Sequence, residues 1–396
     1  MSGHPGQSTA PSPCANAPPP NLYQHLRRPF TISTRNTVEF HIPHGYKNDE
    51  YLGAGQYGNC IKAVAENGVE VAIKKMYSPF KNINIARRIY RELKLLQLID
   101  HENILRIIDI YTPDPSYSAF ENIYMITEYA GMSLDTILKR QRQNLCVLVP
   151  GHITFFIYQL LRALKFLHSA NVIHRDLKPS NLAVQDRGDL TVLDFGMSRV
   201  ISPDDKDKSE YVITRWYRSP EVIYWSQKTY NTKADVWSVG CIFAELLQGK
   251  PLFPGEAAME QYRLIIDLCG SPDEELMRKI ETDGSQAMRR VVEFMGVKPR
   301  QDFKKHFPTF PPLAADLLDK MLVLDADRRI TVEEALKHEY LKDYHEPDDE
   351  PIAASPFEFD DHANATIDDW KRILWQEIAN FKPRETAPPE EEPEHA

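Results

Sequence analysis

The sequence predicts an α+β fold with two lobes, in which a small β-rich lobe precedes a larger helical lobe. In residues 46–130, apolar and polar side chains alternate between turn signals, a pattern typical of half-buried strands. From residue 131 onward, apolar residues recur at helical spacing in segments such as FFIYQLLRALKFLH and LAADLLDKMLVL. A run of strands followed by a run of helices indicates separate β and α layers. We therefore expect one lobe at residues 46–130 and a second at residues 131–341.

The two ends of the chain have compositions that do not support a packed core. Residues 1–30 are rich in Pro, Gly, Ser and Asn, and residues 384–396 consist largely of Glu and Pro. Such segments bury too little apolar surface to offset the entropy lost on ordering. We expect both ends to be disordered arms.

Bulk composition excludes several classes of protein. A net charge of -10 disfavours direct binding to nucleic acid, which requires Lys and Arg concentrated on one face. The five cysteines have neither the spacing of a metal site nor that of a disulfide framework. The chain has no signal-peptide pattern and no apolar run long enough to span a bilayer. We expect a soluble, intracellular protein without a membrane partner.

A glycine-rich stretch, LGAGQYGNC at residues 52–60, contains the spacing G-x-G-x-x-G. This spacing occurs in dinucleotide-binding turns and also in phosphate-binding loops that join two strands. A dinucleotide site requires a helix that begins at the third glycine, Gly58, whereas the sequence continues as a strand, a turn and another strand. The strand-loop-strand interpretation is favoured, and an ordinary glycine-rich hairpin is the alternative.

Lys74 and Glu92 are candidates for an ion pair. Lys74 lies in the strand-like segment VAIKK, and Glu92 lies in INIARRIYRELKLLQLI, beside an apolar stripe at helical spacing. A carboxylate that faces a core requires a cationic partner, because an unpaired buried charge is strongly unfavourable. Lys74 is the natural candidate, and such a pair would hold its ammonium against nucleotide phosphates.

Three oxygen-bearing residues have the spacing required for phosphoryl transfer. The segment VIHRDLKPSN contains Asp176 and Asn181, and VLDFG brings Asp194 a short distance later. The reaction needs a carboxylate that orients the attacking hydroxyl and oxygen ligands that hold magnesium on the phosphates. Asp176, Asn181 and Asp194 supply that set. The order of all these motifs, followed by S-P-E, makes coincidence a poor explanation.

With these motifs in this order, residues 46–383 resemble the eukaryotic protein kinases, and most closely the mitogen-activated protein kinases. The segment TRWYRSPE is similar to the substrate-binding segment of that group, with Ser219 where alanine is usual. The segments HRDLKPSNLAV, DLLDKMLVLDADRRIT and YHEPDDEP are most similar to the stress-activated, high-osmolarity-response branch. The resemblance implies a kinase domain at residues 46–341 and a C-terminal extension at residues 342–383.

The resemblance also implies roles for individual residues, with ATP and Mg²⁺ as cofactors. Asp176 would orient the acceptor hydroxyl, Lys178 would neutralise charge on the phosphoryl group, and Thr214 would help to position Asp176. Lys74 and Glu92 would align the nucleotide, and Asn181 and Asp194 would hold Mg²⁺. Cys60 stands where the family has valine and is either a small apolar substitute or an accessible thiol. The residues implied to contact ATP are Leu52, Gly53, Ala54, Gly55, Gln56, Tyr57, Gly58, Asn59, Cys60, Ala72, Lys74, Thr127, Glu128 and Ala130.

The segment KSEYVITRWYRSPE holds Ser209 and Tyr211 where the family carries a doubly phosphorylated Thr-x-Tyr motif. Phosphoserine would keep the charge and the acceptor oxygens of phosphothreonine, so a switch is expected. The alternative is a merely solvated loop. By resemblance, Arg88, Arg91 and Arg175 would bind the phosphate on Ser209, and Arg215 and Arg218 would bind the phosphate on Tyr211. The segment from Asp194 to Glu221 is longer than is usual in the stress-activated branch, through ISPDDKDK, and residues 139–152 are expanded beside a surface that family members use for docking.

The C-terminal extension contains two features with expected roles. Glu346, Asp348, Asp349 and Glu350 form an acidic cluster, which by resemblance would dock basic peptides of activators, substrates and phosphatases. The segment TIDDWKRILWQEIANF begins with a possible capping box at Thr366 and has an apolar face. We expect this helix to pack onto the kinase domain.

The sequence therefore predicts a serine/threonine kinase of MAP kinase type, acting on Ser/Thr-Pro sites in a stress-signalling cascade. The expected partners are an upstream MAP kinase kinase, protein substrates and MAP kinase phosphatases, and the expected location is cytoplasmic and nuclear. One alternative is a kinase-like docking scaffold with little turnover. Another is a constitutively active kinase in which Glu210 replaces a phosphate, but one carboxylate lacks the charge and oxygens of phosphate.

Overall fold

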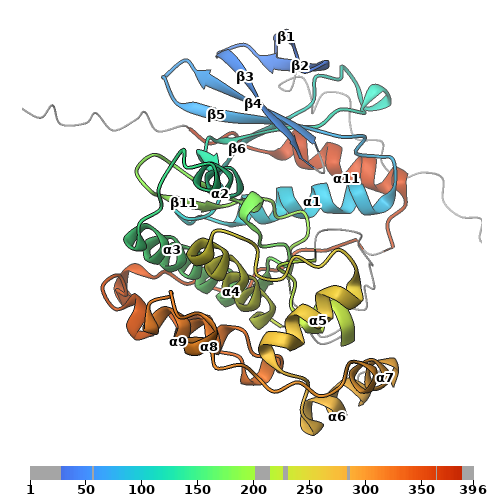
Figure 1. Ribbon diagram of the computed structural model, residues 1–396. Coiled ribbons are helices and arrows are strands. Elements are labelled where there is room, and N and C mark those ends of the chain that lie inside the picture. Colours follow the sequence, from blue (N-terminus) through green and yellow to red (C-terminus); the bar gives the residue numbers. More distant parts are fainter. Residues whose placement is uncertain are drawn as a thin grey trace, which may run out of the picture. The chain divides into compact units, whose positions relative to one another are not determined.

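The computed structural model describes residues 28–55, 58–200, 215–225, 231–282, 286–362 and 364–385 (Figure 1). The chain divides into two compact units. The first, here called the sheet unit, comprises residues up to Ile83, Ile108–Ile126 and residues from Ala365 onward. The second, here called the helical unit, comprises Asn84–Ile107 and Thr127–Asn364. The predicted α+β class is confirmed.

The sheet unit is built on a five-stranded sheet with the order β3-β4-β5-β7-β6 and a separate hairpin, β1-β2. The pairs β1-β2, β3-β4 and β4-β5 are antiparallel, as expected for strands joined by short turns. The strands are β1 (Phe30–Arg35), β2 (Val38–Pro43), β3 (Tyr46–Gly55), β4 (Gly58–Ala65), β5 (Glu70–Met76), β6 (Ile107–Tyr111) and β7 (Tyr124–Glu128).

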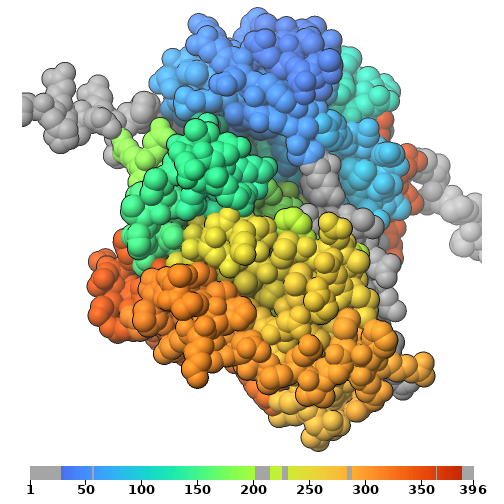
Figure 2. All heavy atoms as spheres, in the orientation of Figure 1, coloured from blue at the N-terminus to red at the C-terminus, as the bar shows by residue number. Residues whose placement is uncertain are grey.

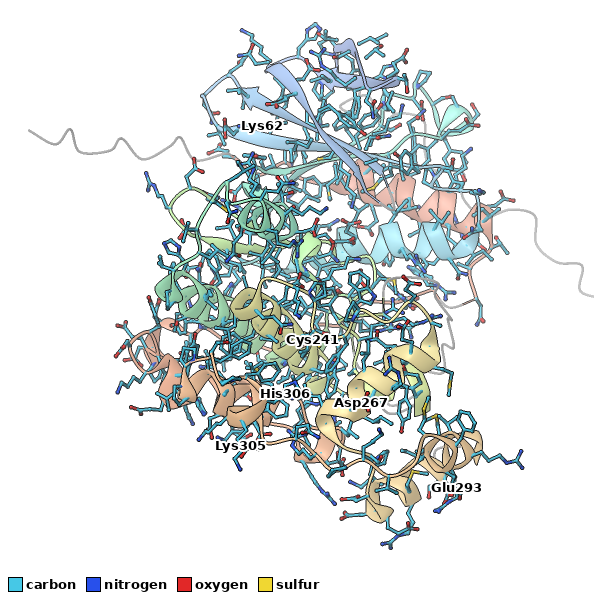
Figure 3. All side chains as sticks on the ribbon, viewed as in Figure 1. Lys62, Cys241, Asp267, Glu293, Lys305 and His306 are labelled. Atoms are coloured by element: carbon cyan, nitrogen blue, oxygen red, sulfur yellow. The ribbon has the colours of Figure 1, made fainter. Side chains whose placement is uncertain are left out.

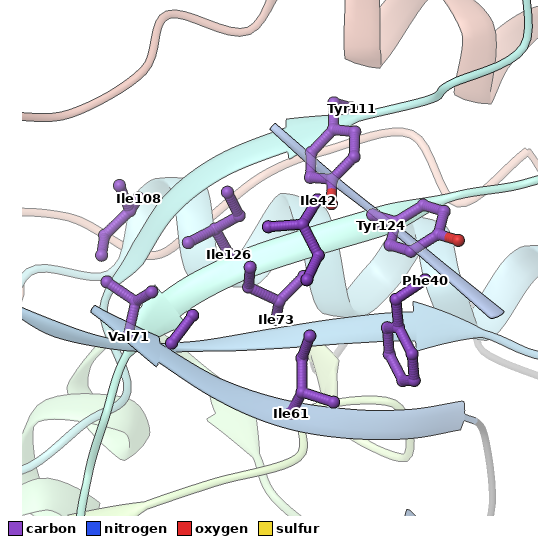
Figure 4. Packing of buried hydrophobic residues seen from close by; sticks show 10 residues of the cluster. Phe40, Ile42, Ile61, Val71, Ile73, Ile108, Tyr111, Tyr124 and Ile126 are labelled. Atoms are coloured by element: carbon purple, nitrogen blue, oxygen red, sulfur yellow. The ribbon is translucent and has the colours of Figure 1, made fainter. Parts of the chain in front are cut away.

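An apolar cluster joins the hairpin to the sheet (Figure 4). Phe40 and Ile42 of β2 pack with Ile61 of β4 and Ile73 of β5, and all four side chains are buried. Tyr111 and Tyr124 stack in the same cluster with ring centroids 5.0 Å apart. Because alternate residues of each strand point to one face, the sequence alternation produces this core directly.

The helix α11 (Ile367–Asn380) belongs to the sheet unit, as expected for the C-terminal segment. Its predicted capping box is confirmed, because Thr366 accepts from the Asp369 N–H and the Asp369 side chain accepts from the Thr366 N–H. The Trp375 ring packs against Tyr117 and Phe120, with ring centroids 5.8 Å and 5.0 Å apart. The apolar face of α11 is therefore covered within its own unit.

The helical unit contains the remaining elements. Its short strands form two sheets, β11-β10-β8 and β12-β9. These strands are β8 (Met132–Ser133), β9 (Val172–Ile173), β10 (Leu182–Val184), β11 (Leu190–Val192) and β12 (Arg199–Val200). The α-helices are α1 (Ile83–Leu98), α2 (Leu134–Arg142), α3 (Pro150–Ser169), α4 (Lys233–Gln248), α5 (Ala258–Cys269), α6 (Glu274–Thr282), α7 (Gln286–Met295), α8 (Phe303–His306), α9 (Pro312–Met321) and α10 (Val332–Leu336). Short 3₁₀ turns lie at Tyr117–Ala119 in the sheet unit and at Pro179–Asn181, Ala326–Arg328, Glu339–Leu341 and Pro347–Asp349 here, and Glu221–Trp225 is a π-helical turn.

The helix α4 is buried along almost its whole length. Its apolar residues from Ala234 to Leu246 lie in the core, and Cys241 lies among them on α4 (Figure 3). A helix that is apolar all round is typical of a core position in a large unit. Within the described part of the chain, no helix is both long and apolar enough to cross a membrane.

The two compact units do not follow the chain order that the sequence suggests. The structure groups Asn84–Ile107, including most of α1, with the helical unit and groups α11 with the sheet unit. The predicted boundary after residue 130 assumes that the chain passes from one lobe to the other only once. This boundary stays a prediction.

Candidate active site

The glycine-rich loop is the turn between β3 and β4. Gly53 pairs with Cys60, and Gly55 pairs with Gly58, so the chain reverses as a hairpin and continues as a strand. No helix begins at Gly58, and the dinucleotide alternative is excluded. A Cβ atom on Gly58 would lie 2.2 Å from the Lys75 carbonyl oxygen, so this position requires glycine. Gln56 and Tyr57, at the tip, lie outside the described residues.

Lys74 lies on β5 directly opposite Cys60 of β4. Burial raises the pKa of the Cys60 thiol to about 11, against the opposing effect of the Lys74 charge. A thiol with this pKa is neutral at physiological pH, which favours the apolar interpretation of Cys60. Ala72 pairs with Lys62, two residues along the strands from the Cys60–Lys74 pair.

The remaining loop residues divide between exposed and structural positions. Leu52 is exposed. Asn59 is buried, and its side-chain oxygen accepts a hydrogen bond of 2.8 Å from the Tyr51 hydroxyl. Ala54 pairs with Asn59 across the hairpin. Asn59 therefore holds the hairpin in shape.

Glu92 lies on α1 with only 2% of its surface exposed, as its position beside the apolar stripe predicts. Lys74 belongs to the sheet unit and Glu92 to the helical unit. The Lys74–Glu92 pair stays a prediction.

The connection after β7 supplies the residues expected to contact adenine. Thr127 is buried, and the Glu128 N–H donates to the Arg106 carbonyl oxygen at 3.2 Å. The Glu128 N–H is therefore occupied, and the Glu128 carbonyl and the backbone of Ala130 stay the predicted partners of a base. Gly131 has φ +90°, and a Cβ there would lie 2.2 Å from the Val184 carbonyl oxygen. Gly131 therefore allows the connection to lie directly against β10.

Asp176 is held by two side chains of its own loop. Lys178 Nζ donates to Asp176 Oδ2 at 2.6 Å, and Asn181 Nδ2 donates to the same oxygen at 3.1 Å and to the Asp176 carbonyl at 2.8 Å. Arg218 Nη2 lies 3.9 Å from Asp176 Oδ1. The structure thus brings Asp176, Lys178 and Asn181 together, with one carboxylate oxygen held by two side chains and the cations of Lys178 and Arg218 nearby.

Asn181 and Asp194 have oxygen atoms suited to a magnesium ion. The Leu193 N–H donates to the Asn181 carbonyl at 2.8 Å, which joins the two segments. Asn181 Nδ2 is used by Asp176, so its amide oxygen is available, and Asp194 Oδ1 accepts from the Gly196 N–H at 3.2 Å. One amide oxygen and one carboxylate are ligands that fit Mg²⁺. Asp194 has φ +58°, an uncommon conformation that is often found at functional sites.

Asp235 of α4 fixes the loop directly before Asp176, a role that the sequence did not predict. Its two carboxylate oxygens accept from the backbone N–H groups of His174 and Arg175, each at 2.9 Å, and Oδ2 also lies 3.1 Å from His168 Nε2. Burial would raise the pKa of Asp235, but the hydrogen bond and charge of His168, with His174 and the Arg175 N–H, hold it below its usual value. These bonds hold Arg175 at φ +69°, just before Asp176. The sequence signal that could have identified Asp235 is a carboxylate in an otherwise apolar helix.

A second buried pair that the sequence did not predict anchors the segment after Arg215. Arg329 forms two bonds with Glu221, Nη1 to Oε1 at 2.7 Å and Nη2 to Oε2 at 3.0 Å. Both residues are buried, and the Arg329 guanidinium lies 5.1 Å from the Trp237 ring centroid. Ser219, which replaces the usual alanine, is also buried.

The predicted phosphate-binding arginines lie on three described segments, and Arg175 lies in the loop directly before Asp176. Arg88 and Arg91 lie on α1, and Arg215 and Arg218 lie on the segment before Glu221. Arg91 forms an ion pair with Asp361 of the C-terminal extension. Ser209, Tyr211 and Thr214 lie outside the described residues.

The acidic cluster of the extension is only partly exposed, which corrects the expectation for Glu350. Glu350 is buried and bonds Lys165 Nζ at 3.0 Å and His345 Nδ1 at 2.6 Å. Asp349 lies 3.0 Å from a guanidinium nitrogen of Arg162, a side chain that is itself buried. A run of acidic residues in the sequence does not show which of them are paired with buried cations. Glu346, Asp348 and Asp349 remain exposed, as a docking surface requires.

The chain is similar in sequence to known proteins. Residues 46–341 match the protein kinase domain family and span both compact units. The chain is 50% identical over 375 residues to mitogen-activated protein kinase pmk-3 of Caenorhabditis elegans, a match that covers 92% of this chain and 79% of that protein. It is 43% identical over 350 residues to mitogen-activated protein kinase 14 of Xenopus laevis, which covers 88% of this chain and 93% of that protein. It is 42% identical over 353 residues to mitogen-activated protein kinase p38b of Drosophila melanogaster, with coverage of 88% and 93%.

Proposed function

The chain belongs to the protein kinases and, among them, to the mitogen-activated protein kinases, and from this membership we propose how it acts and how it is switched. It is a proline-directed serine/threonine protein kinase, and its family requires ATP and a divalent metal. We propose that the metal is Mg²⁺ and that the enzyme acts in a stress-signalling cascade. The relatives that carry p38 and pmk names support this branch.

Asp176 carries the proposal for the chemistry. Its Oδ2 atom is fixed by Lys178 and Asn181, so the carboxylate has a defined orientation toward an acceptor hydroxyl. Lys178 is close enough to Asp176 to place its ammonium beside the transferred group and to offset developing negative charge. Bound ATP supplies the phosphoryl group. Asn181 and Asp194 are the residues that would hold Mg²⁺.

Phosphorylation of Ser209 and Tyr211 is the proposed switch. A phosphoserine carries nearly two negative charges and three acceptor oxygens, which suit the guanidinium groups of Arg88, Arg91 and Arg175. Arg215 and Arg218 would bind the phosphotyrosine. Arg175 is next to Asp176, so binding of a phosphate there would act directly on the catalytic loop.

The proposed partners follow from the family. An upstream MAP kinase kinase and protein substrates with Ser/Thr-Pro sites are expected, and the exposed carboxylates of Glu346, Asp348 and Asp349 suit basic docking peptides. We propose that phosphatases dock there too, and that the kinase acts in cytoplasm and nucleus.

Turnover of a Ser-Pro peptide by the purified protein tests the function. The assay is made before and after treatment with a stress-pathway MAP kinase kinase, on the wild type, Ser209→Ala, Tyr211→Phe and Asp176→Asn. We expect a large rise that either phosphosite substitution abolishes, and no turnover by Asp176→Asn in any state. Activity without phosphorylation would overturn the switch. No turnover by the wild type in any state, with ATP and docking peptides bound, would favour the scaffold.

A further inference from the structure

The buried carboxylate of Glu245 links two segments that lie far apart in the sequence. Glu245 lies in the last turn of α4 with only 2% of its surface exposed. Its Oε2 atom accepts a hydrogen bond of 2.6 Å from the Tyr217 hydroxyl, and its Oε1 atom lies 3.5 Å from Arg142 Nη1. Tyr217 belongs to the segment 215–221, and Arg142 is the last residue of α2.

Arg142 is the cation nearest to this carboxylate. Burial raises the pKa of Glu245, and Tyr217 and Arg142 oppose that effect, while Asp135 adds to it. The same Arg142 Nη1 donates to the Gly249 carbonyl oxygen at 3.2 Å, at the end of α4. Figure 2 shows the green surface of the region that includes α2 meeting the yellow surface of the region that includes α4. Arg142 thus stabilises the ionised form of Glu245, the form that accepts the strong Tyr217 hydrogen bond.

Tyr217 is in turn central to the position of its segment. Its hydroxyl is held by Glu245, and its carbonyl oxygen accepts a hydrogen bond of 2.7 Å from Ser238, also on α4. The neighbouring Trp216 donates from Nε1 to the Gly255 carbonyl at 3.1 Å. Loss of the Glu245 bond would remove the hydrogen bond that the structure gives to the Tyr217 hydroxyl, and we expect the buried ring to shift.

We propose that Arg142 is a positioning residue for substrate recognition, which acts through Glu245 on Tyr217 and so holds the segment that receives the residue after the phosphoacceptor. The inference rests on the proposed function, because that segment is assigned to substrate binding by family membership. The end of α2 would thus influence which residue the enzyme prefers after the phosphoacceptor of its substrate. Arg142 itself touches neither substrate nor nucleotide in this scheme.

Steady-state kinetics of the phosphorylated enzyme test the proposal, with Arg142→Gln, Arg142→Lys, Tyr217→Phe and the double variant Arg142→Gln/Tyr217→Phe. Peptides with Ser-Pro and Ser-Ala are compared. We expect Arg142→Gln to raise the KM for the Ser-Pro peptide about fivefold, with kcat and the KM for ATP nearly unchanged. The preference for Ser-Pro over Ser-Ala should fall by a similar factor, and Arg142→Lys should restore most of it.

The double variant separates a shared path from two independent effects. If Arg142 acts through Tyr217, the double variant should be no more than about twofold worse than either single variant. The matched control is Arg140→Gln, because Arg140 is an exposed arginine of the same helix with no ion pair to a described residue. It should leave the KM and the preference unchanged.

Several results would overturn the inference. These are an Arg142→Gln enzyme with wild-type KM and preference, a loss confined to kcat, and multiplicative effects in the double variant. A lower thermal midpoint with unchanged preference would also count against it, since that is what a merely structural role produces. If the wild type phosphorylates neither peptide, the proposed function fails instead, so the two failures are distinguishable.

Discussion

Arg91 of α1 forms an ion pair with Asp361 of the C-terminal extension, with Arg91 Nε 2.5 Å from Asp361 Oδ1 and a second bond from Nη2 to Oδ2. The Arg91 side chain is buried, whereas that of Asp361 is half exposed. The ring of Tyr90 packs beside this pair against Phe359, with centroids 6.1 Å apart. An arginine proposed to bind the phosphate on Ser209 is therefore already paired with a carboxylate within the helical unit.

We predict that Asp361→Asn destabilises the unphosphorylated protein by about 1–2 kcal/mol, because it removes the charge that compensates a buried guanidinium. Phosphorylation of Ser209 and Tyr211 should reduce this difference, since a phosphate can replace the lost carboxylate. Thermal unfolding of the wild type and the variant, in both phosphorylation states, measures the effect.

Asp360→Asn is the matched control, because Asp360 is exposed and pairs only with His362 among the described residues. It should have little effect in either state. If Asp361→Asn lowers the stability equally with and without phosphorylation, Arg91 stays paired with Asp361 and does not bind the phosphate on Ser209.

Patterns close together in the sequence predicted the fold and part of the site. The hairpin of the glycine-rich loop, the capping box at Thr366 and the buried position of Glu92 each depend on residues within a few positions. Asp176, Lys178 and Asn181 also lie within one short segment, and their contacts match the motif.

The parts that the sequence did not predict depend on partners far apart in the chain. Asp235 bonds the backbone of a loop about sixty positions earlier, and Arg329 bonds Glu221 across a still longer separation. One carboxylate in an apolar helix indicates that a partner exists, but not which one. For Glu350 the sequence indicated exposure where the structure shows burial. It lies in an acidic run, but its bonds to Lys165 and His345 hold it inside the fold.

Charge reversal at Asp348 should slow phosphorylation by the upstream kinase about fivefold and leave turnover of a short peptide unchanged. Asp348 is exposed and has no ion pair among the described residues, so its charge is available to a basic docking peptide. The effect should decrease at high salt, because exposed charges are screened. Rates of Ser209 and Tyr211 phosphorylation at two salt concentrations provide the measurement.

Two further variants control that experiment. Glu293→Lys makes the same charge change on α7, where Glu293 is exposed (Figure 3), and should not slow activation. Asp349→Lys should also destabilise the fold, because Asp349 pairs with the buried Arg162. Equal slowing by Asp348→Lys and Glu293→Lys would mean that net charge, and not a docking surface, controls the rate.

Cys60 should react slowly with iodoacetamide at pH 7.5, about 100-fold below a free cysteine peptide, because its thiol pKa is raised to about 11 by burial. The rate should rise nearly tenfold per pH unit up to pH 9.5. Peptide mass spectrometry follows the modification, with half-buried Cys146 as the internal comparison. Rapid labelling of Cys60 at pH 7.5 that ATP prevents would instead establish an accessible, reactive thiol.

His101 should make the helical unit sensitive to mild acid. Burial, with the nearby charge of Arg162, lowers the pKa of His101 to about 4, against the opposing charges of Asp100 and Asp349. Its Nδ1 atom accepts from the Asn103 N–H at 3.0 Å, a role that only the unprotonated nitrogen can fill. The folded protein therefore favours neutral His101, whereas the unfolded chain protonates it near pH 6.5.

The stabilisation from neutral His101 is present above pH 6.5 and is lost as the pH falls toward 4, because the unfolded state then binds the additional proton. At pH 5 the loss should be about 2 kcal/mol, or roughly 3 °C in the thermal midpoint of a chain of this length. His101→Asn retains an acceptor near the Nδ1 position without a titrating ring, so its midpoint should fall less than that of the wild type between pH 7.5 and pH 5. His44→Asn, at an exposed histidine, should follow the wild type. Equal acid sensitivity of His101→Asn and the wild type would show that His101 is not the group responsible.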